Sequence, residues 1–156
     1  TTLAGTGSSG SANGTGTSAS FNIPYGITTD GTNLYVTDFG NHLIRQIVIS
    51  TGAVTTVAGT GSSGSANGTG TSASFNGPRG ITTDGTNLYV ADQSNHLIRK
   101  IVISTGAVTT VAGTGSSGSA NGTGTSASFN IPSRITTDGT NLYVADFDNH
   151  LIRQIE

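Results

Sequence analysis

The heptapeptide NHLIRQI at residues 41–47 follows the run NLYVTD at residues 33–38 and decides the fold. It returns as NHLIRKI at 95–101 and as NHLIRQI at 149–155, so its copies are 54 residues apart. The string AGTGSSGSANGTGTSASFN has the same period and begins at Ala4, Ala58 and Ala112. The whole chain is therefore a tandem repeat, which has to be recognised before any local assignment is made.

The repeats are nearly identical, which indicates recent amplification or deliberate design. Residues 4–57 and 58–111 differ at six positions: Ile23/Gly77, Tyr25/Arg79, Thr37/Ala91, Phe39/Gln93, Gly40/Ser94 and Gln46/Lys100. The third copy adds Ser133, Arg134 and Asp148. The 156 residues fall six short of three full periods, and the absent stretch corresponds to ISTGAV at 49–54. We expect a single repeat array over 1–156, with repeats at 4–57, 58–111 and 112–156 and the last one truncated.

Each period contains four short runs that are rich in Val, Ile, Thr and Tyr, the composition of β-strands. In the first repeat they are GITTD (26–30), NLYVTD (33–38), NHLIRQIVI (41–49) and AVTTVAG (53–59). Turn residues of hairpin length separate them, such as Asp30-Gly31-Thr32 and Ser50-Thr51-Gly52. No segment has a sustained helical period. The sequence predicts an all-β unit: a four-stranded antiparallel meander followed by a Gly/Ser/Thr-rich connector.

Composition excludes several classes of function. Only 14 of the 156 residues carry a formal charge and the net charge is −2, so the basic surface that non-specific nucleic-acid binding requires is absent. No apolar run is long enough for a membrane helix. The chain has no Cys, which excludes disulfides and thiolate zinc sites and leaves the compartment undetermined. We expect a soluble chain, of a bacterial-type parent or of engineered origin, with neither nucleic acid nor a membrane as its partner.

The repeated NHLIRQI, NHLIRKI and NHLIRQI strings, each preceded by LYVTD or LYVAD, resemble the NHL-repeat signature, and the similarity extends over FNIPYGITTDGTNLYV. The resemblance implies a β-propeller of four-stranded blades, with three blades in this chain. The pattern agrees independently, because NHLIRQIVI has large aliphatic residues on both strand faces and a sheet of this kind must be covered on both sides.

Three blades are too few to close a propeller ring. Taking the strands of a blade as A to D from channel to rim, the segment Thr1–Gly5 is a D strand and the chain stops after a C strand. We therefore predict a strand-exchange clasp in which residues 1–5 complete a neighbour's last blade as its outer strand. The partner is a second copy of this chain, and both a homodimer of six blades and a homotrimer of nine remain open.

Polar residues of the motif recur once per blade, which favours a structural role over catalysis. His42, His96 and His150 each follow an aspartate, Asp38, Asp92 or Asp146, by four residues. A catalytic site needs groups that differ and converge, whereas these repeat at a fixed spacing. We expect them to form structural hydrogen bonds, with Arg45, Arg99 and Arg153 pairing with the same aspartates or lying along the blade. No catalytic residue, metal or cofactor is predicted.

The positions that vary between repeats define a candidate binding face. They lie at the exit of the connector and in the turn between the second and third strands, two connections at one end of a meander. The residues are Tyr25, Phe39, Arg79, Gln93, Ser133, Arg134, Phe147 and Asp148. A binding surface at the channel mouth is one interpretation, and neutral drift at exposed tips is the other.

Two hypotheses of function follow. The first is a non-enzymatic, self-assembling propeller scaffold, either a fragment or an engineered protein. The second is a module that binds a ligand or a protein through the variable face. RNA is disfavoured as the ligand, because that face carries only Arg79 and Arg134 as cations.

Overall fold

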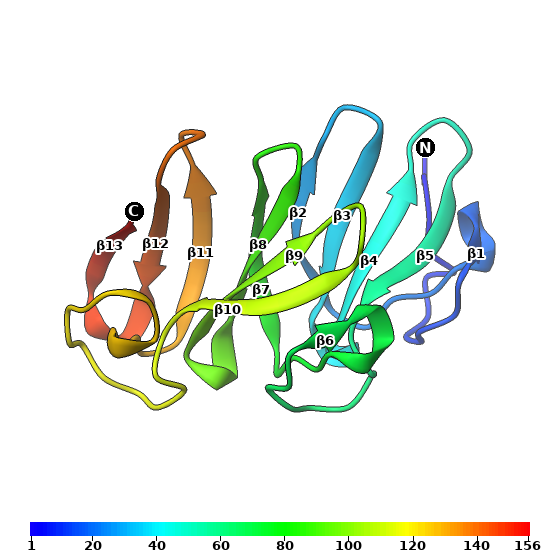
Figure 1. Cartoon of the computed structure of the whole chain (residues 1–156). Coiled ribbons are helices and arrows are strands. Elements are labelled where there is room, and N and C mark those ends of the chain that lie inside the picture. The colour runs from blue at the N-terminus through cyan, green and yellow to red at the C-terminus, as the bar shows by residue number, and fades with distance from the viewer.

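The computed structural model describes all 156 residues and consists of β-strands joined by loops and 3₁₀ turns (Figure 1). Each repeat forms one antiparallel sheet. The first contains β1 (Gly14–Thr15), β2 (Pro24–Thr29), β3 (Asn33–Asp38), β4 (Leu43–Val48) and β5 (Ala53–Ala58). The second contains β6 (Gly68–Thr69), β7 (Pro78–Thr83), β8 (Asn87–Asp92), β9 (Leu97–Val102) and β10 (Ala107–Ala112). The third contains β11 (Pro132–Thr137), β12 (Leu142–Asp146) and β13 (Leu151–Ile155).

The helical content is limited to six 3₁₀ turns of three residues each. They are η1 (Gly16–Ser18), η2 (Phe39–Asn41), η3 (Gly70–Ser72), η4 (Gln93–Asn95), η5 (Gly124–Ser126) and η6 (Phe147–Asn149). No helix is long and apolar enough to cross a membrane.

The predicted four-stranded meander is present, and the connector adds a strand that the sequence analysis missed. The first sheet has the order β1-β5-β4-β3-β2, and the second repeats it as β6-β10-β9-β8-β7. The added strand is short: Gly14 pairs with Val54 and Thr15 with Ala53. The connector thus covers the outer edge of the sheet and leaves fewer unpaired backbone groups there.

The third strand begins two residues later than predicted. Asn41 closes the turn η2, and His42 adopts a left-handed conformation with φ of 56° before β4 starts at Leu43. The segment Thr1–Gly5, predicted as a strand, forms no strand pairing within the single chain, although the equivalent residues 55–58 lie in β5.

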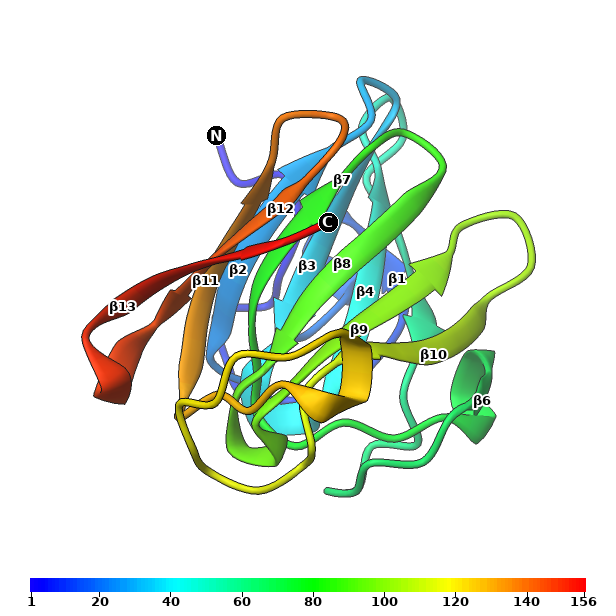
Figure 2. The same cartoon turned by 60° about the vertical axis from the view of Figure 1, so that its left-hand side comes forward.

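The three sheets lie side by side along the chain, from the N-terminal to the C-terminal repeat (Figures 1 and 2). An apolar core fills each junction. Tyr35, Ile44 and Ala58 of the first sheet pack against residues of the second that include Phe75 and Ile81. Ala91, Ile98 and Ala112 of the second sheet pack in the same way against the third. The second sheet is thus covered on both faces, as its two-sided apolar pattern requires.

The strands β2, β7 and β11 run next to one another at the inner edge of the array, and glycine permits their close approach. A Cβ atom on Gly26 would lie 2.3 Å from the carbonyl oxygen of Arg79, and one on Gly80 would lie 2.9 Å from the Cα of Arg134. A side chain at either position would therefore push two neighbouring sheets apart.

An aspartate stabilises the turn between the first two strands of every sheet. Asp30 Oδ1 accepts the backbone N–H groups of Asn33 (2.7 Å) and Thr32 (2.9 Å). The hydrogen bond from Asn33 is the main reason that the pKa of Asp30 falls to about 2, and the pKa of Asp138 falls to about 2 by the same bond from Asn141. At Asp84 burial raises the pKa, but hydrogen bonds from Asn87 and Thr86 outweigh it and lower the value to about 2.

These three turns predict an acid-induced loss of stability. The pKa of an aspartate in an unfolded chain is about 3.9. The stability that the folded protein gains from the three ionised carboxylates is therefore present above that pH, and it is lost as the pH falls through their folded pKa of about 2. The urea concentration at the midpoint of unfolding should decrease as the pH is lowered from 4 to 2. The triple variant Asp30→Asn, Asp84→Asn, Asp138→Asn should have a flatter profile over that interval. An unchanged profile in the variant would place the acid sensitivity elsewhere.

Candidate functional site

The charged residues that recur in every repeat fasten its connector to its sheet. Arg45 Nη1 donates to Asp38 Oδ2 at 2.8 Å and to the carbonyl oxygen of Ser20 at 3.1 Å, and both charged side chains are fully buried. Nη2 donates to the carbonyl oxygen of Ala12 at 3.0 Å and to Asn13 Oδ1 at 2.9 Å. Arg99 with Asp92, and Arg153 with Asp146, repeat the pair at 3.0 Å. The predicted pairing of arginine with aspartate is therefore present in all three repeats.

The histidines join one repeat to the next rather than pairing with the aspartates. His42 Nδ1 accepts the backbone N–H of Gly77 at 3.0 Å, and His96 Nδ1 accepts that of Ile131 at 3.2 Å. His150 has no following repeat in this chain, and it is exposed. All three histidines have the left-handed conformation, and in His42 and His96 the ring reaches the next sheet. The sequence alone does not predict this hydrogen bond, because its acceptor and its donor are 35 residues apart.

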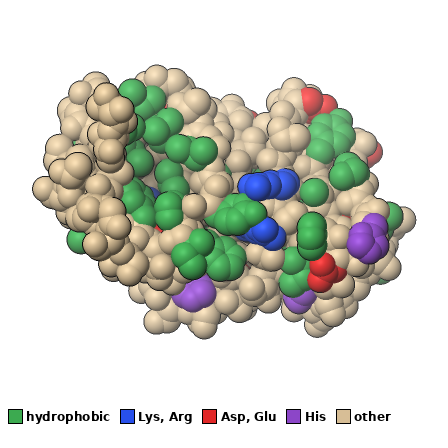
Figure 3. Space-filling model, turned by 180° about the vertical axis from the view of Figure 1, so that it is seen from behind, with side chains coloured by type: hydrophobic (Ala, Val, Ile, Leu, Met, Phe, Trp, Pro, Cys, Tyr) green, Lys and Arg blue, Asp and Glu red, His purple; other side chains and the backbone are tan.

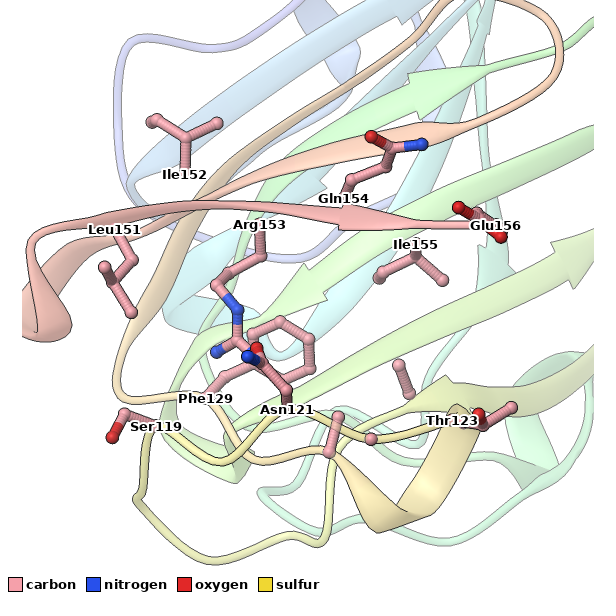
Figure 4. A pocket seen from close by; sticks show the side chains of 14 residues that line it. Ser119, Asn121, Thr123, Phe129, Leu151, Ile152, Arg153, Gln154, Ile155 and Glu156 are labelled. Atoms are coloured by element: carbon pink, nitrogen blue, oxygen red, sulfur yellow. The ribbon is translucent and has the colours of Figure 1, made fainter.

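The third sheet ends in an open groove beside β13. Its order is β11-β12-β13, so it has no counterpart of β5 or β10. Figure 4 shows Arg153, Phe129 and Asn121 on one side of β13, with Ile152 pointing to the other side. Ile152 is 77% exposed, whereas the equivalent Ile44 and Ile98 are fully buried. The C-terminal end of the array thus presents an unpaired strand and a bare apolar face.

The N-terminal end presents the complementary face. Ile27 is 61% exposed, whereas the equivalent Ile81 is 6% exposed within the junction core. Phe21 is half-buried, while its equivalents Phe75 and Phe129 are buried. These side chains lie on the face that, in the second and third sheets, packs against the preceding sheet.

Four residues of the predicted binding face come together at the inner strands. The guanidinium carbons of Arg79 and Arg134 lie 4.4 and 4.6 Å from the centroid of the Tyr25 ring, and Phe39 lies 6.3 Å from it, centroid to centroid. Both arginines donate to the Tyr25 hydroxyl oxygen. Figure 3 shows Lys and Arg side chains next to hydrophobic ones near the middle of this face.

The other predicted face residues have different surroundings. Phe147 and Asp148 are exposed in η6, and Gln93 is half-buried in η4. Ser133 corrects the expectation of an exposed side chain. It is only 5% exposed, because its short side chain stays close to the sheet and its hydroxyl donates to the carbonyl oxygen of Ala145 at 3.4 Å.

No group of three or more His, Asp or Glu side chains lies close enough together to hold a metal ion. Every aspartate of the motif is engaged by hydrogen bonds from its connector and its arginine. Two places could still bind a partner or a ligand: the unpaired edge of β13 and the cluster of side chains around Tyr25.

The comparisons with known proteins agree with the repeat pattern. No family model matches the chain. It is 39% identical over 93 residues to NHL repeat-containing protein 2 of Gallus gallus, which is 58% of this chain and 13% of that protein. Among solved structures, an auxiliary nutrient binding protein of Bacteroides thetaiotaomicron superposes with a TM-score of 0.72 and 26% identity, over 83% of this chain and 36% of that one.

A second auxiliary nutrient binding protein, from Bacteroides ovatus, gives a TM-score of 0.70 and 30% identity, over 81% of this chain and 35% of that one. The chain therefore spans well under half the length of each relative. The three tandem sheets, the recurrent motif and these similarities support the predicted resemblance to NHL-repeat proteins with a β-propeller-type fold.

Proposed function

We propose that this chain is a non-enzymatic propeller scaffold whose ring closes between copies, with residues 1–5 of one copy docking along β13 of the next. The observation that carries the proposal is the exposure of two end faces with the same residue types as the internal junctions. An internal junction joins Tyr35, Ile44 and Ala58 to the following sheet. The seam between copies would join Tyr143, Ile152 and the incoming Ala4 to the neighbour's first sheet.

The register of the internal strand pair defines the docked geometry. Within the first sheet Ile44 pairs with Ala58, Arg45 with Thr56 and Gln46 with Thr55. The segment TTLAG at 1–5 differs from TTVAG at 55–59 only at Leu3. Ile152 would then pair with Ala4, Arg153 with Thr2 and Gln154 with Thr1 of the neighbour. The docked strand would satisfy the free edge of β13, as β-strand addition does in other assemblies.

The receiving face of the neighbour also matches. A set of apolar residues in the second repeat packs against the first sheet. The first repeat has the same residue type at each equivalent position, namely Ala19, Phe21, Ile27, Leu34, Val36, Ile47 and Val54. His150 would find a partner in the seam as well, since Ile23 N–H is the equivalent of the Gly77 group that His42 accepts. Such a head-to-tail contact forms a closed ring when its rotation closes.

One position departs from this match. Arg134 stands where Gly26 and Gly80 allow the inner strands to approach closely. The inner strands of two copies must therefore be farther apart at the seam than inside the chain. This opening adds room at the channel, and rings of six and of nine blades both accommodate it.

A mass measurement on the intact protein tests ring closure. We expect native mass spectrometry across a dilution series to give a single closed species, of two or of three copies, that gives way to monomer only at low concentration. Removal of residues 1–5 should leave a folded monomer at the same concentrations. A chain that is monomeric throughout, or a shortened chain that assembles as well as the parent, would refute the clasp.

A binding module is the second candidate function. The two Bacteroides relatives are described as auxiliary nutrient binding proteins, and the side chains gathered around Tyr25 are a place on this chain where a ligand could bind.

A further inference from the structure

The cluster around Tyr25 has an excess of positive charge that no protein group neutralises. The salt bridges of the structure are those of Arg45, Arg99 and Arg153, all within the structural motif. Arg79 and Arg134 have no carboxylate within 4 Å, and their side chains donate hydrogen bonds only to the Tyr25 hydroxyl. Two cations held beside one neutral ring repel each other, and an anion between or above them would relieve that repulsion.

The cluster is assembled from three neighbouring strands, one residue from each. Tyr25 lies on β2, Arg79 on β7 and Arg134 on β11, and these inner strands lie side by side. The ring of Tyr25 orients both guanidinium groups through cation–π contacts. This positioning reduces the entropy that a ligand would otherwise have to remove from two long side chains.

The cluster occurs once in a chain whose repeats are nearly identical. The equivalents of Tyr25 are Arg79 and Ser133, and the equivalents of Arg134 are Gly26 and Gly80. The three residues that meet therefore all stand at two adjacent repeat positions whose residue types vary between the copies. Neutral change at separate exposed tips gives no reason for the substituted side chains to converge on one ring.

We propose that Tyr25, Arg79 and Arg134 form a binding site for a small oxyanion with two negative charges, such as a phosphate monoester or a short dicarboxylate. Guanidinium forks match the oxygen geometry of both groups through paired N–H···O bonds. Two arginines supply the two charges that a dianion requires. The proposal makes the second candidate function specific, and it stands on one chain, so it holds whether or not the ring closes.

Isothermal titration calorimetry at low ionic strength and pH 8 tests the site, with inorganic phosphate and malonate as dianions and acetate as a monoanion. We expect at least one dianion to bind at one site per chain, at least tenfold more tightly than acetate. Binding of phosphate alone or of malonate alone would identify the class of oxyanion. Dianions that bind no more tightly than acetate would overturn the proposal.

The variants Arg79→Gln and Arg134→Gln should each weaken dianion binding at least tenfold, while Lys100→Gln, which removes the same charge from β9, should change it less than twofold. An equal loss in all three variants would mean that only net charge attracts the anion and would refute a defined site. Native mass spectrometry in the same buffers reports the assembly state separately, so a failure of ring closure and a failure of the anion site give different results.

Discussion

Replacing Asp92 with alanine is expected to lower the free energy of unfolding by about 3–5 kcal/mol, the usual cost of breaking a buried ion pair from one side. Asp92 is fully buried and accepts hydrogen bonds from Asn76 N–H (2.8 Å), Asn95 Nδ2 (2.7 Å) and Arg99 Nη1 (3.0 Å). Alanine would leave the Arg99 guanidinium buried without a counter-charge. It would also leave the connector N–H of Asn76 without its acceptor.

The large effect comes from the broken pair and not from a strong attraction within it. Burial raises the pKa of Asp92 to about 6, which means that desolvation outweighs the stabilisation of the carboxylate by its hydrogen bonds and by Arg99. Arg99 Nε is also buried without a partner. The intact pair therefore adds little to stability, whereas the removal of one member is costly.

Urea denaturation monitored by circular dichroism at pH 7 measures the effect. Asp148→Ala is the matched control, because Asp148 is exposed in η6 and its side chain makes no hydrogen bond. We expect a change within about 0.5 kcal/mol. If Asp92→Ala and Asp148→Ala shift the midpoint equally, the buried motif does not fasten the connector to the sheet.

The sequence predicted the parts of the fold that depend on local chemistry. The second strand, 33–38, is β3 as expected, because Leu34, Tyr35 and Val36 favour a strand and the Asp30-Gly31-Thr32 turn precedes them. The fourth strand and the pairing of Arg45 with Asp38 also follow from residues within one repeat.

Contacts between repeats could not be predicted in the same way. The role of His42 depends on an N–H group in the next sheet, and the convergence of Arg79 and Arg134 on Tyr25 depends on the spacing of three inner strands. The strand β1 was missed because it has only two residues, one of them a glycine, which is depleted in strands, and it pairs where β5 offers a free edge. The equivalent residues 122 and 123 form no strand, since the third sheet has no outer strand to receive them.

Replacing Ile152 with aspartate is expected to weaken assembly at least a hundredfold while the isolated chain stays folded. The burial of an isoleucine side chain contributes about 1.5–3 kcal/mol, and a carboxylate placed in the same apolar contact would add a desolvation cost. A hundredfold change in affinity corresponds to about 2.8 kcal/mol. Because Ile152 is 77% exposed in the single chain, its replacement removes almost no internal packing.

The experiment compares the concentration dependence of assembly with thermal unfolding of the monomer. Thr109→Asp is the control, since it introduces the same charge at an exposed strand position of β10, on an internal sheet. Ile27→Asp should reproduce the effect of Ile152→Asp from the opposite end, because the proposed seam joins these two faces and buries both side chains. Mixing the two variants gives a sharper result. Each variant retains one intact face, so a single seam should form between them and yield an open dimer that cannot close into a ring. A mixture that stays monomeric, or single variants that assemble like the parent, would mean that the exposed end faces do not meet.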